Sequence, residues 1–191
     1  MQLLLLSFLP GWKRPRGGKG FLVLDCVNRV NLFILALIAL AMAGPAFARD
    51  SLGVFGNWGA FRDPAVPRCY AIAIANPTAR RREYQPFAAV ASWPRQNIRG
   101  QVHFRMSRLF ARGGRISVAI GKERFALIGG GADAWAADRR MDAAIVATMR
   151  SASSMTVSAR DARGNAFSET WSLAGAATAM DAAAIGCAQL R

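Results

Sequence analysis

The chain is poor in the residues that most often carry chemistry: it has one histidine and three cysteines among 191 residues. A lone histidine, His103, cannot build a multi-histidine metal site, and it needs a positioned partner before it can act as a general base. The sequence also lacks Gly-x-Ser-x-Gly, His-Glu-x-x-His and phosphate-loop patterns. These absences argue against common hydrolase, metalloprotease and nucleotide-binding classes, and we expect neither a metal nor another cofactor.

Long hydrophobic runs are also missing. The longest apolar stretch, Leu32 to Ala43, has 12 residues, whereas a membrane-spanning helix needs about 20. Arg29 precedes it, and a Gly-Pro pair and an Ala-Phe-Ala sequence ending at Ala48 follow it. This order is typical of a secretory signal peptide. We expect residues 27–48 to be a signal peptide cleaved after Ala48, with an uncleaved membrane anchor as the alternative.

The remaining chain divides around this segment. Residues 1–26 fit neither a signal nor a domain, and we expect them to be a misannotated extension, with translation beginning near Val27. Residues 49–191 number 143, enough for a single domain with its own core. The protein is then periplasmic or secreted, and it meets the membrane only through the signal segment before cleavage.

Removal of the signal leaves two cysteines, Cys69 and Cys187, near the two ends of the expected domain. Two cysteines in an oxidising compartment most simply pair, and the loop they would close spans 118 residues. Two buried free thiols are the alternative. An isolated pair of cysteines without a nearby histidine does not favour a metal site.

Acidic residues and lysine are scarce. After Ala48 there are 20 basic and 10 acidic residues, and 19 of the basic residues are arginine. This balance favours polyanions such as lipopolysaccharide, acidic glycans or nucleic acid, and the candidate contacts are Arg80, Arg81, Arg82, Arg139 and Arg140. No specific nucleic-acid binding is expected, because aromatic residues are not interleaved with these clusters. A GC-rich genome also enriches arginine, alanine and glycine, so charge alone does not assign a partner.

Hydrophobic periodicity predicts a mainly β domain. Residues 101–108, 116–121, 155–159 and 166–173 alternate between apolar and polar, as half-buried antiparallel strands do, with Glu169 as an exception on an apolar face. Residues 68–75 and 87–93 are apolar on both faces and should lie deeper in a sheet. Tight turns are expected at residues 121–123 and 161–165. The Gly129-Gly130-Gly131 run is expected to be a bend at which the chain leaves the sheet.

Two segments have helical spacing. Residues 138–151 place apolar side chains three and four positions apart after Asp138, a good N-cap, and residues 175–188 are rich in alanine. The order of strands, helix, two strands and helix predicts an α+β domain of mainly antiparallel sheet, sandwich-like or strongly bent, with the second helix C-terminal. Asp133, Asp138 and Asp142 lie near the first helix, where capping explains them better than cation binding. A hydrolase built on Asp133 and Asp138 is the least favoured reading.

Several short pieces, in order, resemble the invasion-associated locus B family of alphaproteobacterial exported proteins. They are Gly56-Asn57-Trp58, Cys69-Tyr70, Phe125-Ala126-Leu127, Ala134-Trp135-Ala136, Ala143 to Val146 with Met149, Met155-Thr156-Val157, Ala162-Arg163-Gly164, Thr170-Trp171-Ser172-Leu173, Gly175 and Cys187. The Asp161-Ala162 and Glu169 positions depart from the family pattern, which indicates a divergent member.

The resemblance implies export, a small β-rich domain and two bracketing cysteines. It carries over no catalytic residue, and the matching positions Trp58, Trp135, Arg163, Gly164, Trp171, Ser172, Leu173 and Gly175 are expected to be structural. We therefore expect a cell-envelope protein that acts by binding rather than catalysis. Its partner would be an unknown protein or, as the alternative, an envelope polyanion.

Overall fold

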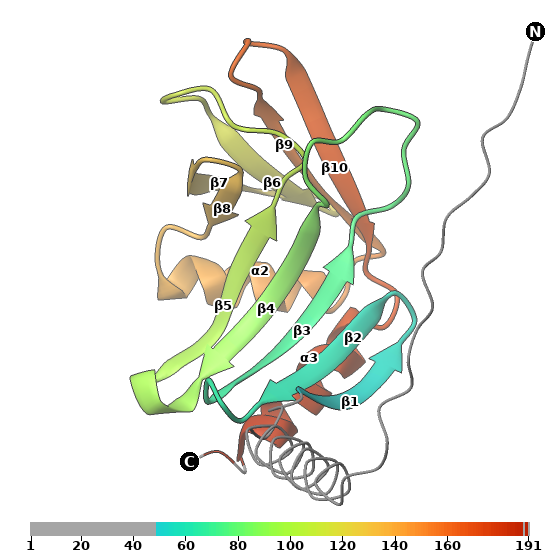
Figure 1. Cartoon of the computed structure of the whole chain (residues 1–191), viewed down its shortest axis with the longest axis vertical. Helices are drawn as coiled ribbons and strands as arrows, with labels where there is room; N and C mark the ends of the chain where they lie inside the picture. Colours follow the sequence, from blue (N-terminus) through green and yellow to red (C-terminus); the bar gives the residue numbers. More distant parts are fainter. Residues whose placement is uncertain (1–48, 189, 191) are drawn as a thin grey trace, which may run out of the picture. The chain divides into compact units, whose positions relative to one another are not determined.

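The computed structural model describes residues 49–188 and residue 190, which form a mostly β structure with two α-helices (Figure 1). The strands are β1 (Asp50–Phe55), β2 (Trp58–Asp63), β3 (Arg68–Ile74), β4 (Phe87–Trp93), β5 (Ile98–Arg105), β6 (Ile116–Ile120), β7 (Glu123–Gly130), β8 (Asp133–Trp135), β9 (Ser154–Arg160) and β10 (Ala166–Ser172). The helices are the 3-10 turn η1 (Pro94–Gln96), α2 (Arg139–Met149) and α3 (Ala176–Ala188). The predictions for residues 1–26 and 27–48 lie outside the described residues.

The ten strands form one sheet in the order β1-β2-β3-β4-β5-β8-β7-β6-β9-β10, and every neighbouring pair is antiparallel. In the view of Figure 1, α2 lies behind β4 and β5, and α3 lies behind β2 and β3. This arrangement confirms the predicted α+β class with mainly antiparallel sheet and a C-terminal second helix.

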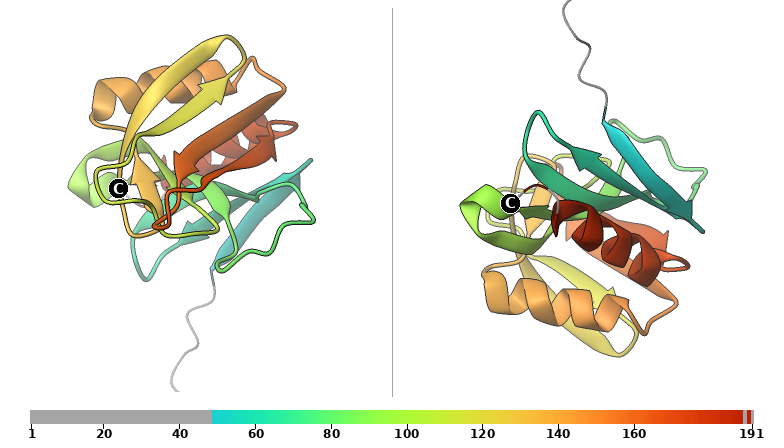
Figure 2. Two further views of the ribbon diagram at one scale, coloured as in Figure 1. Left: turned by 90° about the horizontal axis from the view of Figure 1, so that it is seen from above. Right: turned by 90° about the horizontal axis from the view of Figure 1, so that it is seen from below.

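The sheet bends so strongly that its last strand returns beside its first strands, as the two views of Figure 2 show. The Asn57 backbone N–H donates to the Ala174 carbonyl at 3.1 Å, and the Asn76 N–H donates to the Thr170 carbonyl at 2.8 Å. The indole N–H of Trp58 donates to the Ser172 carbonyl at 2.9 Å. These bonds tie β10 and the chain after it to β2 and β3, so one continuous core fills the bend.

The core follows the period-two pattern of the strands. Side chains that point into the bend are fully buried, including Trp58, Phe104, Val118, Val157 and Trp171. The ring centroids of Phe104 and Trp171 lie 5.8 Å apart, so the two halves of the sheet meet at this aromatic contact. Leu173 is buried in the same cluster. The expected structural positions Trp58, Trp171 and Leu173 are therefore core residues.

A close backbone contact joins the β1–β2 turn to the start of α3. Gly175 has φ +86°, and a Cβ there would overlap the carbonyl oxygen of Phe55. Gly56 has φ +56°, and a Cβ there would lie only 2.5 Å from the Ala174 carbonyl oxygen. Only glycine combines this backbone conformation with the absence of a Cβ. The Gly175 position is thus required for α3 to dock on the strands.

The predicted helices and turns are largely confirmed. The Asp138 carboxylate accepts a hydrogen bond from the Met141 N–H at 2.8 Å, so Asp138 caps α2 as expected. The turn at residues 121–122 joins β6 to β7, and Gly164, with φ +84°, lies in the turn between β9 and β10. Strand β5 begins three residues earlier than predicted, at Ile98, and ends at Arg105. Beyond it, the Met106 N–H still donates to the Ala132 carbonyl, which continues the register of the β5–β8 pair.

One glycine prediction is wrong. Gly129 and Gly130 do not release the chain from the sheet but lie within β7, where they pair with Ala134 and Asp133 of β8. Gly131, with φ +63°, makes the turn between these strands. A Cβ on Gly129 would meet the Ile116 side chain at 2.5 Å, so glycine lets β7 pass close to the core. The short strand β8 and the first two strands were not predicted individually.

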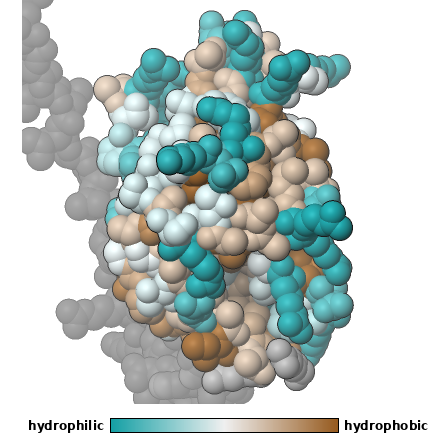
Figure 3. Space-filling view, turned by 180° about the vertical axis from the view of Figure 1, so that it is seen from behind, coloured by the Kyte–Doolittle hydropathy of each residue, from teal (hydrophilic) through white to brown (hydrophobic). Residues whose placement is uncertain are grey.

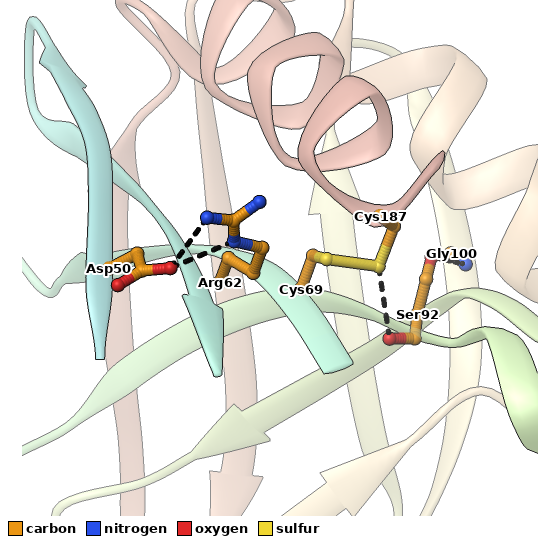
Figure 4. Close-up of a disulfide and its surroundings, with 6 residues drawn as sticks. All are labelled: Asp50, Arg62, Cys69, Ser92, Gly100 and Cys187. Atoms are coloured by element: carbon orange, nitrogen blue, oxygen red, sulfur yellow. Dashed lines mark hydrogen bonds and ion pairs between the residues drawn. A yellow bond between two sulfur atoms is a disulfide. The ribbon is translucent and has the colours of Figure 1, made fainter. Parts of the chain in front are cut away.

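Cys69 of β3 and Cys187 of α3 form a disulfide, with a Cα–Cα distance of 5.5 Å (Figure 4). The pairing agrees with the simpler of the two expectations for these cysteines. Both residues are buried, and the Cys187 sulfur lies 3.7 Å from the Ser92 carbonyl oxygen of β4. The bond therefore fixes the end of α3 to the strands that it covers.

Candidate functional site

A polar cavity of about 780 Å³ lies at the loop end of the sheet. Its charged lining residues are Arg81, Arg82, Glu83, Arg108, Asp161 and Arg163. They come from three separate segments: the 75–86 loop after β3, the 106–115 connection after β5, and the β9–β10 turn. We call this cavity the arginine cleft.

Backbone hydrogen bonds hold the three segments together. The Ser107 carbonyl accepts from the N–H groups of Glu83 and Tyr84 at 3.0 and 3.2 Å. The Leu109 carbonyl accepts from the Ala162 N–H at 3.1 Å. Because the backbones themselves are bonded, the cleft does not depend on side-chain contacts alone for its shape.

Arg82 is fixed at the inner end of the cleft by Glu169 of β10. The guanidinium donates to the Glu169 carboxylate at 2.5 Å and to the Asn76 carbonyl at 2.7 Å. Only 5 % of the Glu169 side chain is exposed, so this is a largely buried ion pair. The pair explains why Glu169 can occupy an apolar strand face, because the Arg82 guanidinium balances the charge of the buried carboxylate. The Nε of Arg82 is buried without a hydrogen-bond partner.

Arg108 is held by Asp161 of the β9–β10 turn, and its guanidinium lies 3.2 Å from the carboxylate. Burial would raise the pKa of Asp161, but hydrogen bonds from the N–H groups of Asn165 and Arg163 and from the Asn165 and Arg108 side chains outweigh it and lower the pKa. The carboxylate therefore stays ionised and orders both the turn and Arg108. The Arg108 guanidinium also lies over the Phe167 ring, 5.9 Å from its centroid.

Arg81 and Arg163 complete the cleft as exposed cations, and no ion pair joins either side chain to another residue in the described ranges. Guanidinium groups bind phosphate, sulfate and carboxylate oxygens through paired N–H bonds. Glu83 opposes them as an exposed carboxylate, so the lining holds four arginines against two acids. The arrangement can bind an anion at Arg81 and Arg163 while Arg82 and Arg108 stay in place.

The five arginines proposed from the sequence do not form one surface. Arg81 and Arg82 line the cleft, whereas Arg80 is exposed in the same loop without lining it. Arg139 and Arg140 are exposed in the first turn of α2 and line no part of the cleft. Sequence reasoning missed Arg108 and Arg163 as cleft residues. The sequence marks Arg163 only as a structural position, in a turn and in the family resemblance, and nothing local marks Arg108, since its partner Asp161 is 53 residues away.

The single histidine lies on the outer face of the sheet, away from the core. His103 Nε2 lies 2.9 Å from an Asp133 carboxylate oxygen, and its ring stacks on Trp135 with centroids 5.2 Å apart. Arg105 pairs with the same carboxylate at 3.1 Å. In the part of the chain that the structure describes, no hydroxyl or thiol is hydrogen-bonded to His103. Asp133 thus belongs to this cluster while Asp138 caps α2, so the two do not form a carboxylate pair.

Within residues 49–188 and 190, no group of three histidine, cysteine or acidic side chains is arranged to hold a metal ion. No helix of the same residues is long and apolar enough to cross a membrane.

Comparison of the chain with protein-family models, curated proteins and solved structures finds no match. The resemblance to the invasion-associated locus B family accordingly remains a proposal from the short motifs. The geometry of the cleft and the disulfide is the independent basis for a functional assignment.

Proposed function

We propose that the protein is an exported cell-envelope protein of the invasion-associated locus B type, which acts by binding rather than catalysis. Its ligand at the arginine cleft is an anionic envelope polymer, such as lipopolysaccharide or an acidic glycan. Export is supported by the signal-like segment before residue 49 and by a disulfide between the two cysteines of the domain.

The convergence of four arginines from three segments carries this proposal. Buried carboxylates hold two of them, and the other two are exposed and form no ion pair within the described chain. The two held arginines fix the walls of the cleft, and the exposed Arg81 and Arg163 keep N–H groups available for an anion. The excess of 20 basic over 10 acidic residues after Ala48 adds a long-range attraction toward the same class of ligand.

Retention on immobilised heparin and binding to lipopolysaccharide, measured from low to high salt, test the proposal. The variant Arg81→Ser/Arg163→Ser should lose at least about ten-fold in affinity at low salt, and its affinity should fall less steeply with salt. The matched control is Arg139→Ser/Arg140→Ser, which removes the same charge outside the cleft and should bind nearly as the unaltered protein does.

If both double variants lost affinity equally, the protein would bind polyanions through its net charge alone. That result would overturn a binding site at the cleft. Saturable turnover of any substrate, abolished by His103→Ala, would overturn the binding role in favour of catalysis. Polyanion binding and turnover can be measured on the same purified preparation, so the two results can be compared directly.

A further inference from the structure

A second cavity, of about 670 Å³, is mainly apolar, in contrast to the arginine cleft. It lies between α2 and α3 over the inner face of β3, β4 and β5. We call it the helix groove. Figure 3 views the molecule from behind the sheet of Figure 1, where apolar residues form a band between projecting hydrophilic side chains. Its volume is within the range of small-molecule sites.

The walls of the groove are built from small side chains. Ala143 and Ala147 line it from α2, and Ala184 and Ala188 line it from α3. Alanine keeps the helical backbones in place but fills little of the space between them. Val146 and Met180 are larger and also line the groove, and the Arg150–Asp181 ion pair joins the two helices, so the space between them is only partly filled.

The floor of the groove is apolar and fixed. The disulfide between Cys69 and Cys187 lines it together with Val90 of β4 (Figure 4). The nearby Ser92 hydroxyl already accepts a hydrogen bond from the Gly100 N–H at 3.0 Å. A ligand in the groove would accordingly meet hydrocarbon and sulfur with its body, and few polar groups in the floor would need new partners.

The charged groups of the groove are both cations. Among the described residues that line it, Arg99 and Arg150 alone carry charge. Arg150 is paired with Asp181 of α3 at 2.7 Å, whereas Arg99 is exposed and no ion pair joins it to another described residue. The groove thus combines an apolar trough with an uncompensated guanidinium at its mouth.

We propose that the helix groove binds a single-chain anionic amphiphile, a long-chain fatty acid, with its hydrocarbon chain along the alanine walls and its carboxylate at Arg99. The shape accepts a narrow apolar chain, and the charge selects an anionic head over a cationic one. This site is separate from the arginine cleft and does not depend on the function proposed there.

Displacement of a fluorescent long-chain fatty acid from the purified full-length protein tests the site, with palmitate as competitor below its aggregation concentration. Palmitate should compete at least about ten-fold better than hexadecyltrimethylammonium, which has the same chain length and a cationic head. Laurate should compete more weakly than palmitate, because it buries fewer methylene groups.

Two pairs of variants locate the binding. Ala143→Phe should reduce palmitate affinity at least about ten-fold by filling the groove, whereas Ala144→Phe, exposed on the same helix outside the groove, should not. Arg99→Glu should reduce the preference for palmitate over the cationic competitor, whereas Arg112→Glu, which makes the same change of charge on an exposed loop, should not. If Ala143→Phe fails to fold, Ala184→Phe from the other wall replaces it.

Equal palmitate affinity in the Ala143→Phe and Ala144→Phe variants would overturn the site. So would equal competition by palmitate and the cationic amphiphile in the unaltered protein. Neither result bears on heparin retention, so this inference and the proposed polyanion function can fail separately.

Discussion

The arginine cleft and the helix groove are cavities of similar volume, about 780 and 670 Å³, yet they are built from opposite materials. The cleft is formed by loops and turns and is held by backbone bonds and buried ion pairs. The groove is formed by two helices and three strands and is held by apolar packing and one disulfide. The two sites should therefore respond to different conditions: salt and acid should affect the cleft, and reductant should affect the groove.

The two sites also differ in which groups are available to bind a ligand. In the cleft, Arg82 and Arg108 are tied to carboxylates and define its walls, so ligand binding falls to the exposed Arg81 and Arg163. In the groove, the small side chains define the space and Arg99 supplies the charge. One site is selective through arranged charge, and the other through shape with a single charge.

The largest expected effect comes from removing the disulfide by Cys69→Ser together with Cys187→Ser. A bond that closes a sequence separation of 118 residues restricts the unfolded chain, and its loss should lower the free energy of unfolding by about 4–5 kcal/mol. Chemical unfolding measures the loss. Fatty-acid binding in the groove should weaken, because α3 is no longer fixed to β3, while heparin retention should persist at temperatures where the protein stays folded.

The unaltered protein in reductant is the control for this variant, and the two should have the same unfolding midpoint. Thiol labelling should detect Cys69 and Cys187 only after reduction. An unaltered unfolding midpoint in the double variant would contradict the stabilising role of the bond.

The next effect concerns the ion pair beneath the cleft. Glu169→Gln leaves the Arg82 guanidinium in a site where only 18 % of its side chain is exposed, and it should cost about 3 kcal/mol in the free energy of unfolding. Replacing both partners, Arg82→Leu with Glu169→Leu, should cost less than the single change, because no uncompensated charge remains. Thermal or chemical unfolding of the three proteins distinguishes these cases. A double variant less stable than Glu169→Gln would contradict the explanation.

Much of the fold could be predicted because each element has a local signal. The strand at residues 87–93 matches β4, and Asp138 marks the start of α2, since alternation and capping are written in neighbouring residues. The prediction for the glycine run was wrong for a non-local reason. Gly129 lies close to Ile116 of the neighbouring strand β6 and pairs with Ala134 of β8, and neither contact is visible in the adjacent sequence. Strand β8 has only three residues, too few for a periodic pattern.

The sites were less predictable than the fold. Arginine clusters are visible in a sequence, but Arg82 is separated from Glu169 by 87 residues and Arg108 from Asp161 by 53. Which arginines are held and which are free depends on these long-range pairs. No sequence motif marks the helix groove. It depends on small alanine side chains from two helices that only the fold brings together.

A smaller effect concerns acid stability at the cleft. The pKa of Asp161 is lowered in the folded protein, so its stabilising contribution is present above the ordinary pKa of an aspartate and is lost as pH falls through the lower folded value. Asp161→Asn should reduce stability at neutral pH, and the difference from the unaltered protein should narrow as the pH falls below about 4. Unfolding curves between pH 7 and pH 3 measure this. A difference that stays constant across that range would contradict the role of the charge.

The smallest effect has the opposite sign and concerns Asp142, a buried residue of α2. Burial raises the pKa of Asp142, outweighing the hydrogen bond that its carboxylate accepts from the Val102 N–H at 2.8 Å. A raised pKa means that the contribution of this residue is present in full at low pH and is lost as pH rises through the folded value. Asp142→Asn keeps an acceptor for Val102 without a buried charge, so it should raise stability at neutral pH by up to about 1 kcal/mol and have little effect near pH 3. If Asp142→Asn and Asp161→Asn instead shift the unfolding midpoint in the same direction at neutral pH, the electrostatic contrast between the two regions is wrong.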